Sequence, residues 1–265
     1  MAELTPMMQQ YVEMKKEYKD CILFYRLGDF YEMFFEDAIT ASRELEITLT
    51  GKNCGMEERA PMCGVPYHSV EGYLNRLVSK GYKVAICEQV EDPKQTKGIV
   101  KREVVRVVTP GTNLNTQALD EGKNNYIMCI VYIGDKYGIS TADVTTGDYF
   151  VTEIETSEKL FDEVYKFMPS EIVCNEAFYM SGVDLEELKE RLGITIYSLE
   201  AWYFDDLLCV NTLKDHFKVS SLEGLGLKDY ECGIIGAGAL LKYLLETQKT
   251  SLDHLTKLTG YTTGK

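Results

Sequence analysis

The sequence lacks the features that would place it in a membrane or on an export pathway. No run of about 18 apolar residues occurs, which is the minimum for a membrane-spanning helix. The first ten residues, MAELTPMMQQ, do not show the basic and then apolar pattern of a signal peptide. We therefore expect no membrane partner and a cytoplasmic location.

The eight cysteines lack the spacing of a metal site or a disulfide framework. None forms a CxxC pair, and most lie inside apolar runs. Reduced, buried thiols in a cytosolic protein are the preferred interpretation. The cysteines are Cys21, Cys54, Cys63, Cys87, Cys129, Cys174, Cys209 and Cys232.

Motifs of the common enzyme classes are also missing. The patterns GxSxG, HExxH and GxGxxG do not occur, and none of His68, His216 and His254 stands at a metal-ligand spacing. Residues 260–265, GYTTGK, have three residues between the glycines where a phosphate loop needs four. We expect no catalytic residue, no metal site and no cofactor in this chain, and hence no enzyme.

Positive charge is scarce, and it is unevenly placed. Residues 1–122 carry 15 Lys and Arg against 19 Asp and Glu, whereas the remaining residues carry 13 against 23. The excess acid is therefore concentrated in the second half. A polyanionic partner such as nucleic acid would have to meet the first half.

Residues 1–112 predict a mixed-sheet α/β domain. Thr5 followed by Pro6 indicates a helix start, because Thr caps a helix and Pro fits its first position. Apolar patterning then predicts strands over 21–26, 47–50, 61–67, 83–89 and 100–108, with helices over 34–44 and 69–80.

The second half predicts a different α/β layout. Residues 113–124 are polar and suit a linker. Three strands in quick succession and then alternating helices and strands over 125–250 describe a ribonuclease-H-like layered sheet. Residues 251–265 are interpreted as a truncated connection to absent domains.

The ribonuclease-H-like pattern raises the possibility of a nuclease. Such an enzyme needs carboxylates that converge on metal ions. The first strand of this half, NYIMCIVYI, carries none, and the fourth ends in Asn175. Asp143 stands nearly alone and is expected to cap the turn at 145–147. The sequence therefore argues against nuclease activity.

A basic strip runs along the end of the first half. Between residues 94 and 106 there is one acid, Glu103. The strip could lie against phosphates, or it could be a solvated edge strand protected by lysines, and its composition alone does not decide. Its basic residues are Lys94, Lys97, Lys101, Arg102 and Arg106.

The stretch GDFYEMF at 28–34 places aromatics and an acid directly after an apolar strand. Phe30 on a glycine turn could be a core residue or a wedge between bases. Wedging costs a few kcal/mol of unstacking on paired DNA, and stacking returns roughly 1–3 kcal/mol. A defective base pair is cheaper to unstack, so a wedge would detect weak points in a duplex.

Glu32 points the same way as Phe30 if the chain is extended. Phosphates repel an acid. Glu32 would therefore favour binding only where a mispaired base offers a free N–H, and it would disfavour binding to paired DNA. The alternative is that Phe30 and Phe34 are core residues and Glu32 caps the next helix. Spacing alone leaves both interpretations open.

Several long motifs together resemble the MutS family of bacterial DNA mismatch repair proteins. Looser similarity continues through 143–147 and the helix ending at 243–248, so that the resemblance covers about residues 4–255. The strongest motifs are FYRLGDFYEMF (24–34), PMCGVPYH (61–68), VAICEQ (84–89) and VVRVVTPGT (104–112).

The resemblance implies a mismatch-binding domain at 1–112 and a connector domain at 125–250 with a ribonuclease-H-like fold and no nuclease activity. It implies that Phe30 stacks on a mispaired base in double-stranded DNA and that Glu32 hydrogen-bonds it. Lys52, Met62 and Arg102 match positions near the minor groove or the backbone, and Lys97 and Lys101 join them from the basic strip.

The family's lever, clamp and ATPase domains have no counterpart in this sequence. We therefore expect an N-terminal fragment of a homodimeric, nucleoid-associated protein that uses ATP and Mg²⁺ and recruits MutL through the connector. The alternative is a relative that acts as a protein-interaction module in recombination or signalling. The intact Phe30 and Glu32 pattern argues against that alternative.

Overall fold

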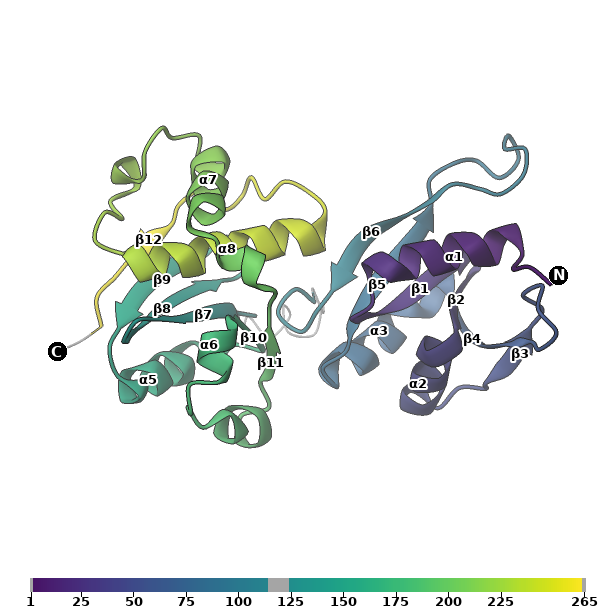
Figure 1. The fold of residues 1–265 in the computed structure, drawn as a ribbon, viewed down its shortest axis with the longest axis horizontal. Coiled ribbons are helices and arrows are strands. Elements are labelled where there is room, and N and C mark those ends of the chain that lie inside the picture. Colours follow the sequence, from purple (N-terminus) through teal and green to yellow (C-terminus); the bar gives the residue numbers. More distant parts are fainter. Residues whose placement is uncertain (1, 114–123, 264–265) are drawn as a thin grey trace. The chain divides into compact units, whose positions relative to one another are not determined.

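The structure is a computed structural model in which residues 2–113 and 124–263 are described. The chain divides into two compact units, residues 1–113 and 114–265 (Figure 1). Most of the predicted linker, 113–124, lies outside the described residues. Both units contain a mixed sheet with helices, which confirms the predicted α/β class. None of the described helices is both long enough and apolar enough to cross a membrane.

The first unit is built on a six-stranded sheet with the order β3-β4-β2-β1-β5-β6. Only β1 and β5 run parallel, and the other neighbours are antiparallel. The strands are β1 (Cys21–Leu27), β2 (Phe30–Phe34), β3 (Thr50–Lys52), β4 (Ala60–Pro66), β5 (Lys83–Gln89) and β6 (Arg102–Val108).

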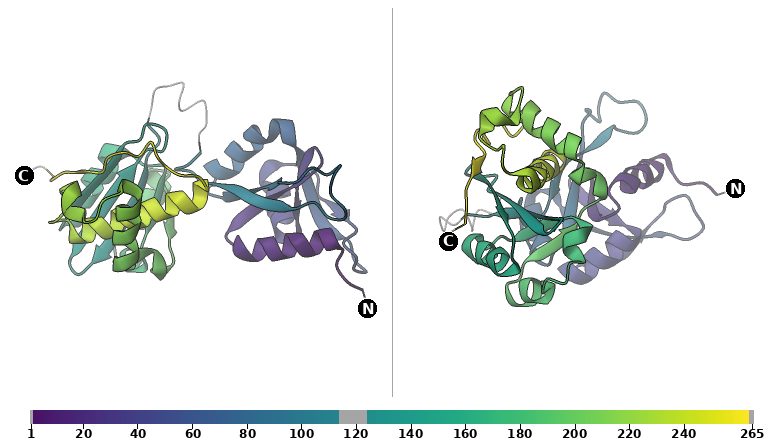
Figure 2. Two further views of the ribbon diagram at one scale, coloured as in Figure 1. Left: turned by 90° about the horizontal axis from the view of Figure 1, so that it is seen from above. Right: turned by 60° about the vertical axis from the view of Figure 1, so that its left-hand side comes forward.

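Helices cover both faces of this sheet (Figure 2). The front face packs against α1 (Pro6–Glu17), whose Met8 and Tyr11 enter a core with Leu23, Tyr25 and Phe34. As predicted, Thr5 caps this helix by accepting a hydrogen bond from the Met8 amide. The back face packs against α2 (Phe35–Leu45) and α3 (Val70–Ser79), which follows a 3-10 turn, η1 (Tyr67–Ser69).

The strand predicted at 47–50 is wrong in its bounds. The strand in this region is β3, which pairs with β4 only from Thr50 onward, where Thr50 lies opposite Met62. Leu49 is instead 46% exposed. An apolar run forms a strand only where a neighbour supplies the ladder hydrogen bonds, and here that pairing begins where the apolar residues end.

The second unit is built on a sheet with the order β11-β10-β7-β8-β9-β12. Strands β7, β8 and β9 form the predicted antiparallel meander, and β10 and β11 add to it in parallel beside β7. This is the order that a ribonuclease-H-like sheet requires. The strands are β7 (Ile127–Ile133), β8 (Lys136–Ala142), β9 (Tyr149–Ile154), β10 (Glu171–Cys174), β11 (Thr195–Ser198) and β12 (Thr259–Gly260).

Helices cover both faces of the second sheet as well. One face packs against α7 (Asp206–Phe217) and the largely buried α8 (Glu231–Gln248), and the other packs against α5 (Ser157–Phe167) and α6 (Glu176–Tyr179) (Figure 2). The helix predicted near 184–192 contains a π-helical turn, η2 (Glu187–Arg191), and short 3-10 turns occur at η3 (Ala201–Phe204) and η4 (Leu222–Leu225).

The segment predicted as a truncated connection contributes to the second unit over its described residues. Leu252, Leu255 and Leu258 are each less than 5% exposed and belong to the core beside α8. Strand β12 then pairs in parallel with β9. Burial of these three leucines stabilises the packing of this segment on the sheet. The leucines are three residues apart in the sequence, but the polar residues between them make the segment look like an exposed connection.

All eight cysteines are buried and free. Burial raises the pKa of Cys63 and of Cys87 to about 12. These thiols therefore stay protonated near neutral pH and act as small core residues, in agreement with the interpretation from sequence.

Candidate nucleic-acid interface

A two-residue turn presents Phe30 at one end of the first sheet. Gly28 and Asp29 join β1 to β2, with Leu27 opposite Phe30. Gly28 has a φ of +58°, a conformation that glycine adopts without steric penalty and that tight hairpin turns require. Phe30, the first residue of β2, is 47% exposed. The side chain is therefore not a core residue, and its role as a wedge stays a prediction.

The alternation of β2 sorts its side chains onto the two faces of the sheet. Tyr31 and Met33 point to the back face and are buried among residues of α2 and α3. Phe30, Glu32 and Phe34 point to the front face, where Phe34 is fully buried beneath α1. Tyr31 and Phe34 thus hold this stretch to the core from opposite faces of the sheet.

Glu32 is paired with Lys52 on the front face. The Lys52 ammonium lies 2.9 Å and 3.3 Å from the two carboxylate oxygens of Glu32. Lys52 comes from β3 and Glu32 from β2, with β4 between them. The side chains are 32% and 14% exposed, so the ion pair is reached by solvent from one side. Such a partly buried pair lies between an exposed pair, which contributes little to stability, and a buried pair, which is costly to break.

Met62 and Gly64 of β4 lie next to β2 and β3, and we refer to them, together with Phe30, Glu32 and Lys52, as the Phe30 group. Met62 is half-buried, opposite Phe34 and Thr50 in the two neighbouring strands. A Cβ atom at Gly64 would lie 3.5 Å from Glu32 Cγ and 3.8 Å from Phe30 Cδ1. The backbone of Gly64 therefore lies against the side chains of Glu32 and Phe30. Sequence reasoning missed it, although a glycine inside a predicted strand often marks a close approach.

Arg102 is turned inward. It is 8% exposed, and its guanidinium donates to the Arg26 carbonyl at 2.8 Å and to Gln10 Oε1 at 2.9 Å. It also lies 4.6 Å from the ring centroid of Tyr25, whose pKa burial raises to about 12 against the opposing effect of the Arg102 charge. In this conformation Arg102 joins the start of β6 to the end of β1, and its role toward DNA stays a prediction.

Lys97 and Lys101 are exposed on the loop between β5 and β6. Glu91 orders this loop by accepting hydrogen bonds from the Lys101 amide and the Thr96 hydroxyl, both at 3.2 Å. Lys101 forms a solvent-exposed ion pair with Glu103 at 3.4 Å. The loop leaves the same end of the sheet as the Phe30 turn, but β1 lies between β5 and β2, and both β1 and β5 lie between β6 and β2. The structure therefore does not bring these lysines into the Phe30 group.

The carboxylate of Asp143 in the second unit is occupied by main-chain groups. It accepts from the amides of Thr145 at 2.8 Å and of Asn125 at 3.2 Å, and from the Thr145 hydroxyl at 2.6 Å. The predicted turn cap is confirmed. Asn175 bridges the start of α6 and the backbone of Tyr132. No cluster of three metal-ligating side chains occurs among the described residues.

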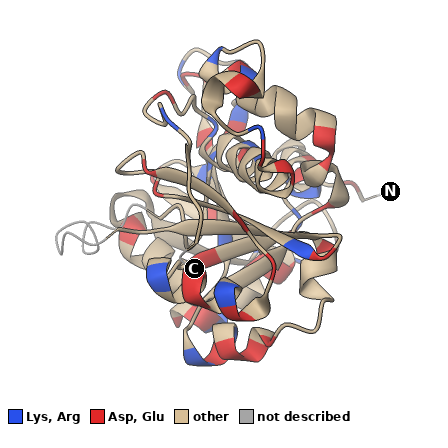
Figure 3. Ribbon diagram, turned by 90° about the vertical axis from the view of Figure 1, so that its left-hand side faces the viewer, with Lys and Arg blue, Asp and Glu red and all other residues tan. Residues whose placement is uncertain are grey.

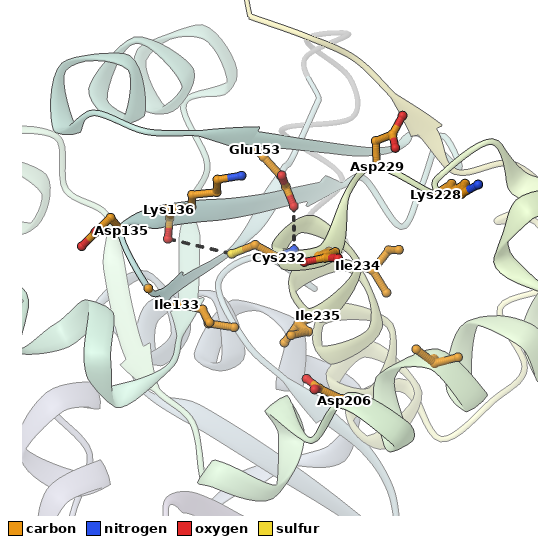
Figure 4. A pocket seen from close by; sticks show the side chains of 13 residues that line it. Ile133, Asp135, Lys136, Glu153, Asp206, Lys228, Asp229, Cys232, Ile234 and Ile235 are labelled. Carbon is orange, nitrogen blue, oxygen red and sulfur yellow. Dashed lines mark hydrogen bonds between the residues drawn. The ribbon is translucent and has the colours of Figure 1, made fainter.

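A pocket of about 1070 Å³ opens on the second unit at the start of α8 (Figure 4). Glu153 accepts hydrogen bonds from the Cys232 amide at 2.6 Å and the Gly233 amide at 2.9 Å, so these two N–H groups in the first turn of the helix already have a partner within the protein. Asp and Glu also outnumber Lys in the lining, and both signs are spread over the elements of this unit (Figure 3). These features disfavour a phosphate ligand here.

The chain is similar to known proteins over nearly its whole length. Residues 5–117 match the family model described as MutS domain I, and residues 125–256 match MutS domain II. The DNA mismatch repair protein MutS of Lachnoclostridium phytofermentans is 68% identical over 265 residues, which is 100% of this chain and 28% of that protein. The proteins of the same name from Ruminiclostridium cellulolyticum and Acetivibrio thermocellus are 52% and 53% identical, each over 98% of this chain and 30% of the relative. The chain thus spans less than a third of the length of these curated relatives.

Proposed function

Because this chain belongs to the MutS family of DNA mismatch repair proteins, we propose that its first unit recognises mispaired bases in double-stranded DNA. The observation that carries the proposal is the exposed Phe30 directly after a two-residue hairpin turn, with Glu32 two residues further on along the same face of the sheet.

Phe30 acts as the wedge in this proposal. A ring that enters between base steps must first unstack them, which costs a few kcal/mol on intact DNA. Stacking on the displaced base returns roughly 1–3 kcal/mol, so insertion is favourable mainly where pairing is already weakened. The 47% exposure of Phe30 leaves its ring available for this contact without unfolding of the sheet.

Glu32 reads the displaced base in this proposal. Its pairing with Lys52 holds the carboxylate on the front face and offsets part of its repulsion from phosphates. When a mispaired base offers an N–H, Glu32 accepts that hydrogen bond. Lys52 and Met62 then lie at the edge of the contact, toward the minor groove and the backbone.

Lys97 and Lys101 supply phosphate contacts in this proposal. Both are exposed on an ordered loop at the same end of the sheet, and each contact with a phosphate releases condensed counterions. Arg102 supports the loop from within through its bonds to β1 and α1, and its contact with DNA is then indirect.

The second unit serves as the connector in this proposal. It relays the state of the DNA-bound unit to the ATPase part of the full-length protein and contributes to the contact with MutL. In this proposal, ATP and Mg²⁺ binding, homodimer formation and sliding on DNA are functions of the full-length protein; this chain spans less than a third of the length of its relatives. A cytoplasmic, nucleoid-associated location follows from the substrate.

The test is a binding measurement on the full-length protein with Phe30→Ala. Fluorescence anisotropy would give the affinity for a duplex with one G·T mismatch and for the matched duplex. We expect the preference for the mismatch to fall about tenfold or more, because alanine has no ring to stack on the base. Phe30→Tyr, which keeps a stacking ring, should retain most of the preference, and Tyr165→Ala in α5 controls for removal of an exposed ring.

An unchanged preference in Phe30→Ala would contradict the proposal. The protein would then be better described as an interaction module of a MutS-like relative.

A further inference from the structure

The turn that carries Phe30 is held from the back face of the sheet. Four side chains meet there, and we refer to them as the brace: Arg26 of β1, Tyr31 of β2, Glu88 of β5 and Tyr67 of η1. Arg26, Tyr31 and Glu88 occupy strand positions of the same parity as the residues that pack on α2 and α3, and Tyr67 lies against Arg26 from η1. The brace thus lies on the face of the sheet opposite Phe30 and Glu32.

Arg26 is the centre of the brace. Its Nε donates to the Gly28 carbonyl at 2.6 Å, and its Nη1 lies 3.1 Å from Glu88 Oε2. The flat guanidinium is stacked 3.6 Å from the ring centroid of Tyr67. One side chain therefore contacts the turn, the neighbouring strand β5 and the 3-10 turn η1 that follows β4. The side chain is only 17% exposed.

Two further hydrogen bonds hold Glu88 and the second residue of the turn, Asp29. The Tyr31 hydroxyl donates to Glu88 Oε1, and burial together with this bond raises the pKa of Tyr31, which keeps it a donor. The Tyr67 amide donates to the Asp29 carbonyl at 2.7 Å. Both carbonyls of the Gly28–Asp29 turn are thus fixed, one by Arg26 and one by Tyr67.

We propose that Arg26, oriented by Glu88, is a positioning residue that presets the Phe30 turn for insertion into DNA. The inference rests on the proposed function of Phe30 as the wedge. A loose turn would lose conformational entropy on binding, whereas a turn fixed in advance does not. Stacking energy of roughly 1–3 kcal/mol is small enough for that loss to decide whether insertion is favourable.

Arginine is the side chain that this position needs. A guanidinium offers donors in a planar fork and a flat surface for stacking, so it bonds a carbonyl and a carboxylate while lying on Tyr67. Lysine keeps the charge but has neither the fork nor the flat surface. Arg26→Lys therefore removes the positioning contacts and leaves the net charge of the unit unchanged.

The experiment is a double-mutant cycle on the full-length protein with a G·T mismatched and a matched duplex as probes. Arg26→Lys should lower the ratio of mismatched to matched affinity about fivefold, with affinity for the matched duplex unchanged within about twofold. In the Phe30→Ala background the same substitution should have no further effect, because Arg26 acts only through Phe30. Glu88→Gln should behave as Arg26→Lys does.

Arg43→Lys is the matched control. Arg43 lies in the same unit and forms an ion pair with Glu44, but it is 63% exposed at the end of α2. We expect it to leave the ratio unchanged. Hydrogen exchange of the peptide spanning the turn gives a second readout, and it should be faster in Arg26→Lys than in Arg43→Lys while exchange in α2 and α3 is the same.

Additive effects of Arg26→Lys and Phe30→Ala would overturn the proposal. An equal fall in affinity for both duplexes would instead assign Arg26 to a direct contact with the DNA backbone, which carries no sequence or mismatch information. If Arg26→Lys does not fold, Glu88→Gln decides by the same criteria. If Phe30→Ala loses the mismatch preference but Arg26→Lys keeps it, only the positioning role is refuted. If the preference survives Phe30→Ala, the proposed function and the positioning role are both refuted.

Discussion

Asp143 in the second unit and Glu32 in the first unit both lie on or beside a strand of a six-stranded mixed sheet, yet their surroundings differ. Asp143 is 1% exposed, and backbone amides of its own turn and of Asn125 occupy its oxygens. Glu32 is reached by solvent and is paired with one lysine side chain. A carboxylate enclosed by main-chain donors stabilises the fold, whereas one paired with a movable side chain remains available to a ligand.

The largest effect is expected for Asp143→Ala. The substitution leaves the amides of Thr145 and Asn125 without their acceptor in a partly buried turn, so the free energy of unfolding of this chain should fall by about 2–4 kcal/mol. Urea denaturation followed by circular dichroism measures it. Asp135→Ala, in the exposed β7–β8 turn, is the control and should change stability by less than about 0.5 kcal/mol. If Asp143→Ala and Asp135→Ala lower the free energy of unfolding by the same amount, the main-chain hydrogen bonds of Asp143 do not stabilise the fold.

Arg102→Met should give the next largest effect. The substitution removes bonds to the Arg26 carbonyl and to Gln10, and we expect a loss of about 2 kcal/mol in stability. Arg191→Met, at an exposed ion pair with Glu187, should lose less than about 1 kcal/mol. If Arg102→Met keeps its stability and instead lowers the salt dependence of DNA binding, Arg102 contacts phosphate, a role compatible with the position that the family resemblance implies.

Glu32→Ala should change binding rather than stability. Removal of the carboxylate deletes an acceptor for the mispaired base and relieves repulsion from paired DNA, so the mismatch preference of the full-length protein should fall about fivefold to tenfold. Glu44→Ala is a close control, because Glu44 also pairs with a lysine, Lys80, at 3.2 Å. A loss of stability comparable to that of Asp143→Ala would show that Glu32 is a structural residue.

The smallest effect is expected when Lys97 and Lys101 are both replaced by alanine. Exposed loop lysines that meet phosphates add affinity for any duplex, so matched and mismatched DNA should be weakened equally. The slope of log affinity against log salt should fall by about 0.9 for each phosphate that a lysine no longer neutralises. Lys159→Ala, in α5 of the second unit, should leave the slope unchanged. A change in mismatch preference would place the loop in the Phe30 group after all.

Much of the fold could be predicted from local sequence patterns. Helix α1 begins where Thr5 and Pro6 indicate, because a cap and its helix lie within one turn of chain. The meander of β7, β8 and β9 and its turn at Asp143 followed from alternation and turn residues. The bounds of β3 and the packing of Leu252 could not be predicted in this way, since both depend on which distant strand or helix lies alongside.

The sequence alone determined that Phe30 and Glu32 point the same way and that Tyr31 points the other way, because extended backbone alternates whatever surrounds it. Only the tertiary structure decided that Phe30 is exposed and that Glu32 is paired with Lys52. It also turned Arg102 inward, toward acceptors 76 and 92 residues away along the chain. The physical reason is that a long, flexible side chain takes the partners that the fold brings within its reach, and local sequence does not specify those partners.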